Sequence, residues 1–198
     1  MKLKILQAGD PVLRQRARLL SSEEIRSGSI QQLIEFMRET MRDAPGVGLA
    51  APQVGLPLQL AVIEDPPERL RDVDPEVLAE RKRSPVPFHV VLNPRLYVEQ
   101  DQPVEFFEGC LSLAGFAGLV SRTRIVRVEC LNERAEPVVI NASGWHARIL
   151  QHEIDHLEGI LYIDRAETRS LTTTENLARY WNDMTTDQVR SALGIRRR

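Results

Sequence analysis

The sequence predicts an α+β fold in which antiparallel strands pack around one central helix. Two observations support this prediction. Between residues 90 and 140, short apolar segments follow one another at spacings that leave no room for the helical crossovers of a parallel sheet. One long helical pattern comes directly after them, and further helical patterns lie towards both ends of the chain. Strands that are bracketed by helices without alternating with them are typical of the α+β class.

The 198 residues match the length of one compact domain, and 42% of them are hydrophobic, which is enough to build a buried core. We therefore predict a single domain over residues 1–198. Two segments stand out within it: a charged, proline-rich excursion at about 64–85 and a helical segment at about 173–194. The excursion is predicted to be a solvated surface loop with a helical turn or two around 75–83, and a functional lid is the alternative.

Charge and composition exclude several classes of protein. With 26 Lys+Arg and 28 Asp+Glu the net charge is −2, so bulk positive charge does not drive binding to nucleic acid, and no specific DNA contact is expected. No apolar run approaches the length of about 18 residues that a membrane span needs. Two cysteines are too few for a disulfide scaffold, and no secretory signal precedes them. A globular protein of a reducing compartment is therefore expected.

The first third of the chain is predicted to contain two helices, a loop and a strand. Asp10 is a candidate N-cap for a short helix that begins at Pro11. Ser29 opens a capping-box pattern, and apolar residues then recur at helical intervals as far as about residue 44. Residues 46–55 are small and glycine-rich, which predicts an ordered loop, and residues 58–63 are predicted to form a buried strand.

The rest of the chain is predicted to contain the sheet and the remaining helices. The strand candidates are residues 90–93, 96–99, 104–108, 119–121, 125–131 and 137–140. A helix over 144–158 follows them, with Ser143 as N-cap and Gly159 beyond its end. Two further helices are predicted over 175–184 and 187–193.

The helix over 144–158 carries an H-E-x-x-H motif at residues 152–156. The spacing of His152 and His156 places both imidazoles on one helix face, one turn apart, where they can hold one metal ion. Glu153 lies beside the first of them, within reach of a water bound to that ion. The chain has only four histidines, and two of them lie in this motif on a face that also carries Trp145 and Ile149. The sequence therefore predicts a metal-binding helix, and two hydrogen-bonded core histidines are the alternative.

A metal site needs a third protein ligand, for which the sequence offers two kinds of candidate. No histidine follows the motif, so a downstream ligand would be one of the acidic residues Glu158, Glu167 and Glu175. The other candidate is Cys110, which lies at the end of a predicted strand. The second cysteine, Cys130, alternates into a strand and is expected to be a small buried hydrophobic residue.

Three separated blocks resemble the peptide deformylase family. They are residues 46–53 (GVGLAAPQ), 108–112 (EGCLS) and 151–157 (QHEIDHL), and residues 9–14 (GDPVLR) also resemble the start of the family. The likeness spans roughly residues 5–165. It implies a peptide-deformylase-like fold and a metal-dependent hydrolase that removes the N-formyl group from the N-terminal methionine of newly made polypeptides, releasing formate.

The resemblance implies a complete metal site. Cys110, His152 and His156 would hold one divalent ion and leave its fourth position for water, as in catalytic sites. Glu153 would accept the proton of that water. Fe²⁺ is the ion expected in the cell, and Zn²⁺ or Ni²⁺ is expected as a substitute in purified material.

The resemblance also implies roles for neighbouring residues. The Gln53 side-chain amide and the Leu111 backbone N–H would stabilise the oxyanion. Glu108 would pair with Arg122 and lock the cysteine strand against the next one, with a weak surface ion pair as the alternative. Gly46 and Gly48 would let an extended peptide approach the backbone and pair with it. The candidates for the methionine pocket are Val47, Phe106, Trp145 and Ile149, and plain core packing is the alternative for each.

Partners and cellular location follow from the family alone. The substrates would be nascent N-formylmethionyl peptides, so contact with the ribosome is implied. The basic end, Arg196–Arg198, would be a frayed tail, with an RNA contact as the alternative. Ala114–Phe116 and Ser143–Trp145 are more similar to the organellar branch, and Ala117 stands where many bacterial members have an arginine. We expect a cytoplasmic bacterial protein, with a processed organellar protein as the alternative.

Two rival functions fit parts of the pattern. A zinc endopeptidase would use a third ligand downstream of His156 and would give Cys110 no role. A non-catalytic module that binds formyl peptides or metal would keep the ligands and would not need Glu153 as a base.

Overall fold

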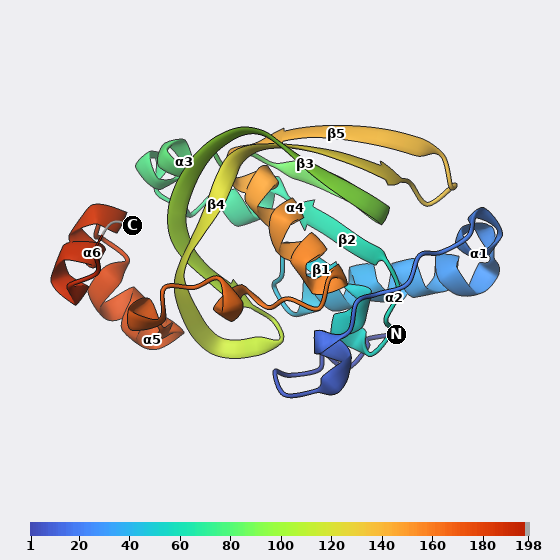
Figure 1. The fold of residues 1–198 in the computed structure, drawn as a ribbon, viewed down its shortest axis with the longest axis horizontal. Helices are drawn as coiled ribbons and strands as arrows, with labels where there is room; N and C mark the ends of the chain where they lie inside the picture. The colour runs from blue at the N-terminus through green and yellow to red at the C-terminus, as the bar shows by residue number, and fades with distance from the viewer. Residues whose placement is uncertain (197–198) are drawn as a thin grey trace.

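A computed structural model describes residues 1–196, with the exception of the side chains of residues 99–102. Long curled strands surround one helix, α4 (Gly144–Leu157), which lies in the middle of the molecule (Figure 1). The helices of the N-terminal third lie at one end, and the C-terminal helices lie at the other (Figure 1). The predicted α+β arrangement around a central helix is confirmed.

Six strands form one antiparallel sheet in the order β1-β2-β3-β4-β5, and β6 pairs with β4. The strands are β1 (Gly48–Ala50), β2 (Leu60–Asp65), β3 (Val86–Cys110), β4 (Leu113–Leu131), β5 (Pro137–Ser143) and β6 (Thr172–Thr173). The antiparallel pairing predicted from the short spacings is confirmed.

The division of the sheet into many short strands was wrong. The predicted strands 90–93, 96–99 and 104–108 are parts of β3, and 119–121 and 125–131 are parts of β4. Register shifts occur where the predicted strands end, at Leu92/Arg95, Val98/Gln100 and Gln100/Pro103. Such irregularities bend a strand without ending its pairing, so β3 and β4 stay paired while they curl around α4.

Both helices predicted in the N-terminal third are present, and the cap of the second one is corrected. Asp10 caps the short helix Pro11–Arg14 by accepting a hydrogen bond from the Val12 backbone, as predicted. After α1 (Ser22–Arg26), α2 (Gly28–Asp43) begins earlier than expected: its cap is Ser27 and not Ser29, because the Ser27 hydroxyl accepts from the Ile30 backbone. The apolar face of α2 is buried against β1 and β2.

The glycine-rich segment 46–55 is only partly a loop. It contains the strand β1 and a 3₁₀ turn at Ala51–Val54, so the prediction of a loop throughout was wrong. Gly48 pairs with Ile63 and Ala50 with Ala61, and all three residues of β1 are fully or almost fully buried. A strand this short has no alternation to detect, but it forms one end of the sheet beside α4.

The excursion at 64–85 contains the 3₁₀ turn Pro67–Leu70 and α3 (Pro75–Arg81). The helical turn predicted around 75–83 is confirmed, and Asp74 caps it. The Arg83 guanidinium donates two hydrogen bonds, of 2.7 and 2.9 Å, to the carboxylate of Asp65, which is fully buried. This ion pair links the end of the excursion to β2.

The helix α4 has its predicted bounds to within one residue, and Gly159 beyond it adopts a φ of 75°; Ser143 stands at the N-cap position, but its side chain makes no capping hydrogen bond. The predicted helix over 175–184 was wrong in part, because α5 (Thr174–Asn176) gives way to a π-helical turn at Leu177–Trp181. The last helix, α6 (Thr186–Leu193), agrees with the prediction. Arg197 and Arg198 of the predicted basic tail lie outside the described residues. Within the described part of the chain, no helix combines the length and the apolar character needed to cross a membrane.

Candidate active site

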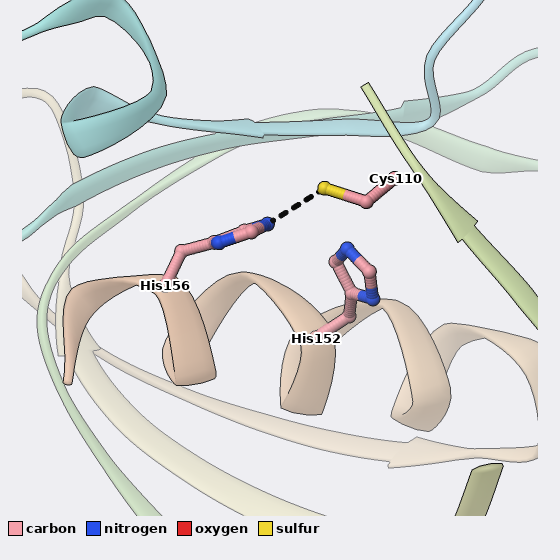
Figure 2. Close-up of side chains that lie close together, drawn as sticks. All are labelled: Cys110, His152 and His156. Atoms are coloured by element: carbon pink, nitrogen blue, oxygen red, sulfur yellow. Dashed lines mark hydrogen bonds between the residues drawn. The ribbon is translucent and has the colours of Figure 1, made fainter. Parts of the chain in front are cut away.

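Three potential metal ligands converge between the end of β3 and the middle of α4. The Sγ atom of Cys110 and ring nitrogens of His152 and His156 all lie within 4.8 Å of one another. Figure 2 shows both rings on the side of α4 that faces Cys110, with a contact of 3.3 Å between Cys110 Sγ and His156 Nε2. The structure thus brings together the three residues that the sequence singled out, from elements far apart in the chain.

The donor set suits a divalent ion. One thiolate and two imidazoles form a typical binding set for zinc or a first-row transition metal. Burial lowers the pKa of His156 well below its usual value, so its ring is neutral, as a ligand must be. His152 contacts Glu108 through Nδ1, which leaves Nε2 for the ion.

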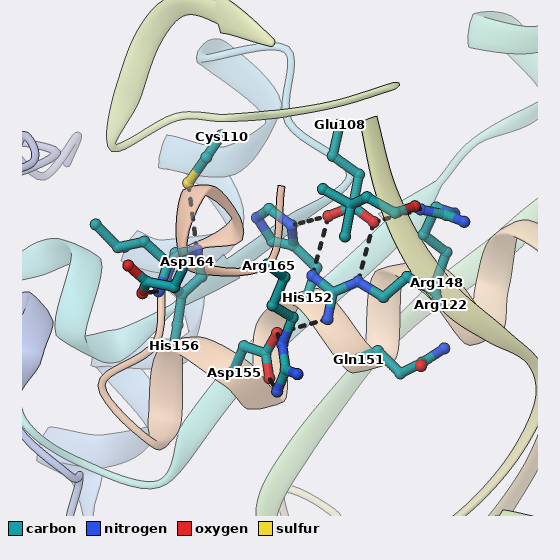
Figure 3. A network of polar contacts seen from close by, with 12 residues as sticks. Glu108, Cys110, Arg122, Arg148, Gln151, His152, Asp155, His156, Asp164 and Arg165 are labelled. Carbon is teal, nitrogen blue, oxygen red and sulfur yellow. Dashed lines mark hydrogen bonds and ion pairs between the residues drawn. The ribbon is translucent and has the colours of Figure 1, made fainter. Parts of the chain in front are cut away.

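A buried carboxylate, Glu108, lies directly behind His152 (Figure 3). It accepts two hydrogen bonds of 3.0 Å from Arg122 and one of 2.6 Å from Arg148, and its contact with His152 Nδ1 is 3.0 Å. Burial alone would raise the pKa of Glu108, but the contacts with His152 and Arg122 prevail and hold it well below its usual value. The carboxylate stays charged, so it fixes the His152 ring in one orientation.

Sequence reasoning missed three members of this network. Arg148 was not among the predicted site residues, yet it is buried and also donates to the Val104 and Val120 carbonyl oxygens. Asp155, also on α4, pairs with Arg122 and accepts two hydrogen bonds of 2.7 Å from Arg165 (Figure 3). The only signal was that charged residues occupied a helix whose other faces were apolar.

Glu153 lies under the edge strand β1 and is 4% exposed. Burial raises the pKa of its carboxyl group to about 7. Its Oε2 atom has no hydrogen-bond partner among the described residues. A Cβ atom on Gly48 would lie 2.2 Å from Glu153 Oε1, so glycine is needed at this position of β1.

Gln53 is buried at the other side of the sulfur atom. Its Oε1 atom accepts a 2.8 Å hydrogen bond from the Ala50 backbone, which fixes which end of the amide is the donor. Its Nε2 atom then lies 3.5 Å from Cys110 Sγ and 3.1 Å from Ser112 Oγ. Ser112, fully buried, was not predicted, and its own backbone N–H lies 3.4 Å from the same sulfur.

A cavity of about 560 Å³ opens beside these groups. Of the residues predicted for substrate binding, it is lined by Gly46, Val47, Gly48, Trp145 and Ile149. Leu111 and Gln53 also line it.

Phe106, a candidate for the methionine pocket, does not line this cavity. Successive side chains of a strand point to opposite faces, so Phe107 lines the cavity instead. Phe106 lies against Trp145, with ring centroids 6.2 Å apart. Phe116, Arg148 and Thr174 line the cavity and were not predicted. A second cavity, of about 690 Å³ beside α6, is lined by none of Cys110, His152 and His156.

The chain is similar to known deformylases over most of its length. Residues 2–171 match the polypeptide deformylase family. Peptide deformylase 3 of Streptomyces avermitilis is 46% identical over 193 residues, which cover 98% of this chain and 84% of that protein. The mitochondrial peptide deformylase of Homo sapiens is 40% identical over 177 residues, covering 89% of this chain and 71% of that protein.

Solved structures agree with this likeness. The crystal structure of a peptide deformylase from Synechococcus elongatus in complex with actinonin is 39% identical, with a TM-score of 0.69, and covers 84% of this chain and 82% of that one. A class I type b peptide deformylase from Acinetobacter baumannii with bound Met-Ala-Ser is 31% identical, with a TM-score of 0.74, and covers 83% of this chain and 98% of that one. The chain belongs to the polypeptide deformylase family, and as a metal-dependent hydrolase it removes the N-formyl group from nascent polypeptides.

Proposed function

We propose that Cys110, His152 and His156 hold the catalytic ion and that the formyl group is hydrolysed at the mouth of the adjacent cavity. The observation that carries this assignment is the convergence of one sulfur and two imidazoles within 4.8 Å beside a cavity of about 560 Å³. When bound, the ion polarises the formyl carbonyl and lowers the pKa of water towards 7.

Glu153 is the general base in this proposal. A base works best when its pKa lies near the operating pH, and burial brings that of Glu153 to about 7. Its unpartnered Oε2 atom is available to a water molecule, and the buried position keeps bulk solvent away. Glu153 takes the proton of the attacking water and returns it to the nitrogen of the leaving amine, so the products are formate and a free N-terminus.

Gln53 and Leu111 stabilise the negative charge that forms on the formyl oxygen. The Ala50 backbone holds the Gln53 amide with its NH₂ group beside the sulfur ligand, so this donor needs no rearrangement when the charge develops. The backbone N–H of Leu111, directly after Cys110, is the second donor in this proposal.

The methionine side chain occupies the cavity, and the peptide extends along β1. The cavity lining is mainly apolar, as an unbranched thioether requires. At the end of the sheet, β1 pairs with β2, which leaves its other edge for an added peptide strand. The relative from Acinetobacter baumannii was solved with Met-Ala-Ser bound, and a peptide of this kind is the product that we assign to the present chain.

Three finer assignments rest on the family resemblance. We propose Fe²⁺ as the ion in the cell and expect Zn²⁺ or Ni²⁺ in purified material, since a thiolate–imidazole set accepts all three. Nascent chains as substrates imply contact with the ribosome. The relatives are both bacterial and organellar, and we propose a bacterial cytoplasm, with a processed organellar protein as the alternative.

The zinc endopeptidase alternative needs an acidic ligand downstream of His156. Among the described residues, Glu158 contacts Arg16 and Gln59 instead, and the one cluster of three or more metal-ligating side chains contains Cys110. Full metal occupancy in a Cys110→Ser variant would support this alternative.

The proposal is tested by formate release from formyl-Met-Ala-Ser with protein prepared anaerobically and loaded with Fe²⁺. We expect turnover by the native protein and a loss of several orders of magnitude in Glu153→Ala, with metal content unchanged. Activity that persisted in Glu153→Ala would contradict the assignment of the base. Metal binding without turnover in the native protein would favour a non-catalytic module.

A further inference from the structure

Trp145 contacts arginine side chains as well as the cavity. Trp145, the second residue of α4, lines the cavity with one part of its surface. Guanidinium groups cover its indole ring: the Cζ atoms of Arg81, Arg83 and Arg148 lie 5.1, 5.5 and 5.9 Å from the ring centroid. Two of these arginines, Arg81 and Arg83, come from the excursion at 64–85.

Arg81 differs from the other two arginines in its partners. Arg83 pairs with Asp65, and Arg148 pairs with Glu108. Arg81 forms no ion pair with any residue that the structure describes, although it is largely buried, and this burial lowers its pKa. Its guanidinium lies over two aromatic rings, at 5.1 Å from Trp145 and 5.7 Å from Phe106. These cation–π contacts are the interactions that hold it there.

The backbone of the excursion also touches the residue just before Trp145. Gly144 has a φ of +60°, and a Cβ atom there would lie 2.6 Å from the Lys82 carbonyl oxygen and 3.0 Å from that of Arg81. The end of α3 is therefore packed on the start of α4. Only a glycine at position 144 permits this contact.

A second contact joins the excursion to the cavity. Arg69, in the turn before α3, donates a 2.5 Å hydrogen bond to the carbonyl oxygen of Gly46, which lines the cavity. Arg81 does not line the cavity itself; it borders a small space of about 60 Å³ that it shares with Phe106 and Phe107. The excursion thus supports the cavity from outside, at Gly46 and at Trp145.

We infer that the 64–85 excursion determines which side chains the substrate pocket accepts, and that Arg81 is a positioning residue that holds the Trp145 ring in the pocket wall. This inference rests on the proposed function, because it takes the cavity as the methionine pocket. Arg81 acts through Trp145 and does not touch the substrate. Without its guanidinium the indole gains room to move away from the cavity, and the pocket admits larger side chains.

The test compares formyl-Met-Ala-Ser with formyl-Phe-Ala-Ser in native protein, Arg81→Ala and Arg71→Ala. Arg71→Ala is the matched control, because Arg71 is an exposed arginine of the same excursion whose ion pair is with Glu68. In Arg81→Ala we expect kcat/KM for formyl-Met-Ala-Ser, divided by kcat/KM for formyl-Phe-Ala-Ser, to fall about 5- to 10-fold. The change should come mainly from KM, and its size is in the range that the shape of a pocket controls. In Arg71→Ala the ratio should stay within about 2-fold of the native value.

A direct measurement follows the indole itself. The chain has two tryptophans, so Trp181→Phe leaves Trp145 as the only one. In that background, Arg81→Ala should increase quenching of Trp145 fluorescence by acrylamide, and Arg71→Ala should not.

The outcomes separate this inference from the proposed function. An unchanged substrate ratio in a folded Arg81→Ala variant that still deformylates formyl-Met-Ala-Ser overturns the role of the excursion alone. Absence of formate release by the native, iron-loaded protein overturns the proposed function. If Arg81→Ala does not fold, Arg81→Met keeps the apolar stem without the cation, and the same ratio decides the question.

Discussion

Gly48 and Glu153 are in direct contact: the α-carbon of the glycine faces the carboxylate so closely that a Cβ atom would lie 2.2 Å from Oε1 and 2.5 Å from Cδ. The first residue of the edge strand therefore determines where the candidate base lies. Glu153 is buried beneath β1 and lines the cavity, so a methyl group on residue 48 would have to displace its carboxylate.

Gly48→Ala should reduce kcat at least about 100-fold with metal content unchanged, since the methyl group displaces Glu153 from its working position. Steady-state kinetics and metal analysis of the purified variant measure this. Gly28→Ala is the control, because no atom lies within 4 Å of a Cβ at that position. Full activity in Gly48→Ala would show that the position of Glu153 does not limit the reaction.

Gln53→Leu should lower kcat about 100- to 1000-fold and leave KM for formyl-Met-Ala-Ser nearly unchanged, because it removes a donor that acts on developing charge. Gln59→Leu is the control: Gln59 is also buried, but it contacts Glu158 and does not line the cavity. An effect of Gln53→Leu on KM alone would assign this side chain to substrate binding.

Glu108→Gln should weaken metal binding about 10- to 100-fold, because the neutral amide no longer orients His152 as firmly. The substitution also removes the negative charge that pairs with the buried guanidinium groups of Arg122 and Arg148. We therefore expect a loss of about 3–5 kcal/mol in the free energy of unfolding. Competition with a chelator and urea denaturation measure the two effects. Glu129→Gln, in a partly exposed pair with Arg127, should cost less than about 1 kcal/mol. Equal costs in both variants would contradict the buried network.

Stability should fall in mild acid because of His146. Its ring lies 5.2 Å from that of His89, and burial, aided by His89, lowers the pKa of His146 to about 4. In the unfolded chain the pKa is about 6.5, so between pH 6.5 and 4 the unfolded state binds a proton that the folded state does not. The free energy of unfolding should therefore decrease as the pH falls through this window, by about 1–2 kcal/mol at pH 5 relative to pH 7.

His146→Gln tests this pH dependence. Urea denaturation at pH 7 and pH 5 should show a smaller decrease in the variant than in the native protein. An identical decrease in both would mean that other groups are responsible.

Much of the metal site could be predicted because its signals are local. The i, i+4 spacing of His152 and His156 needs only a helix, and α4 has the predicted bounds to within one residue. Cys110 could be proposed but not placed by spacing alone, because its approach to the two histidines depends on how the whole sheet curls. The resemblance to the family supplied what the periodicity could not.

The errors have a common physical origin in long-range packing. The bulges that bend β3 look like strand ends in the sequence, and β1 is too short to show alternation. Arg148 and Asp155 could not be assigned to the site from the sequence because their partners, Glu108 and Arg165, come from other elements. Phe106 and Phe107 are adjacent, so the register of β3 was needed to decide which of them faces the cavity.

The three candidate metal ligands come from two parts of the chain that meet only after the sheet has wrapped around α4. A partly synthesised chain that lacks α4 holds the thiol and neither of the two rings. The metal site is therefore completed only late in the synthesis and folding of each chain, and the supply of the divalent metal acts on finished copies only. A shortage of this metal would then leave finished copies without their ion, and these copies would become active when the ion is added, without new synthesis.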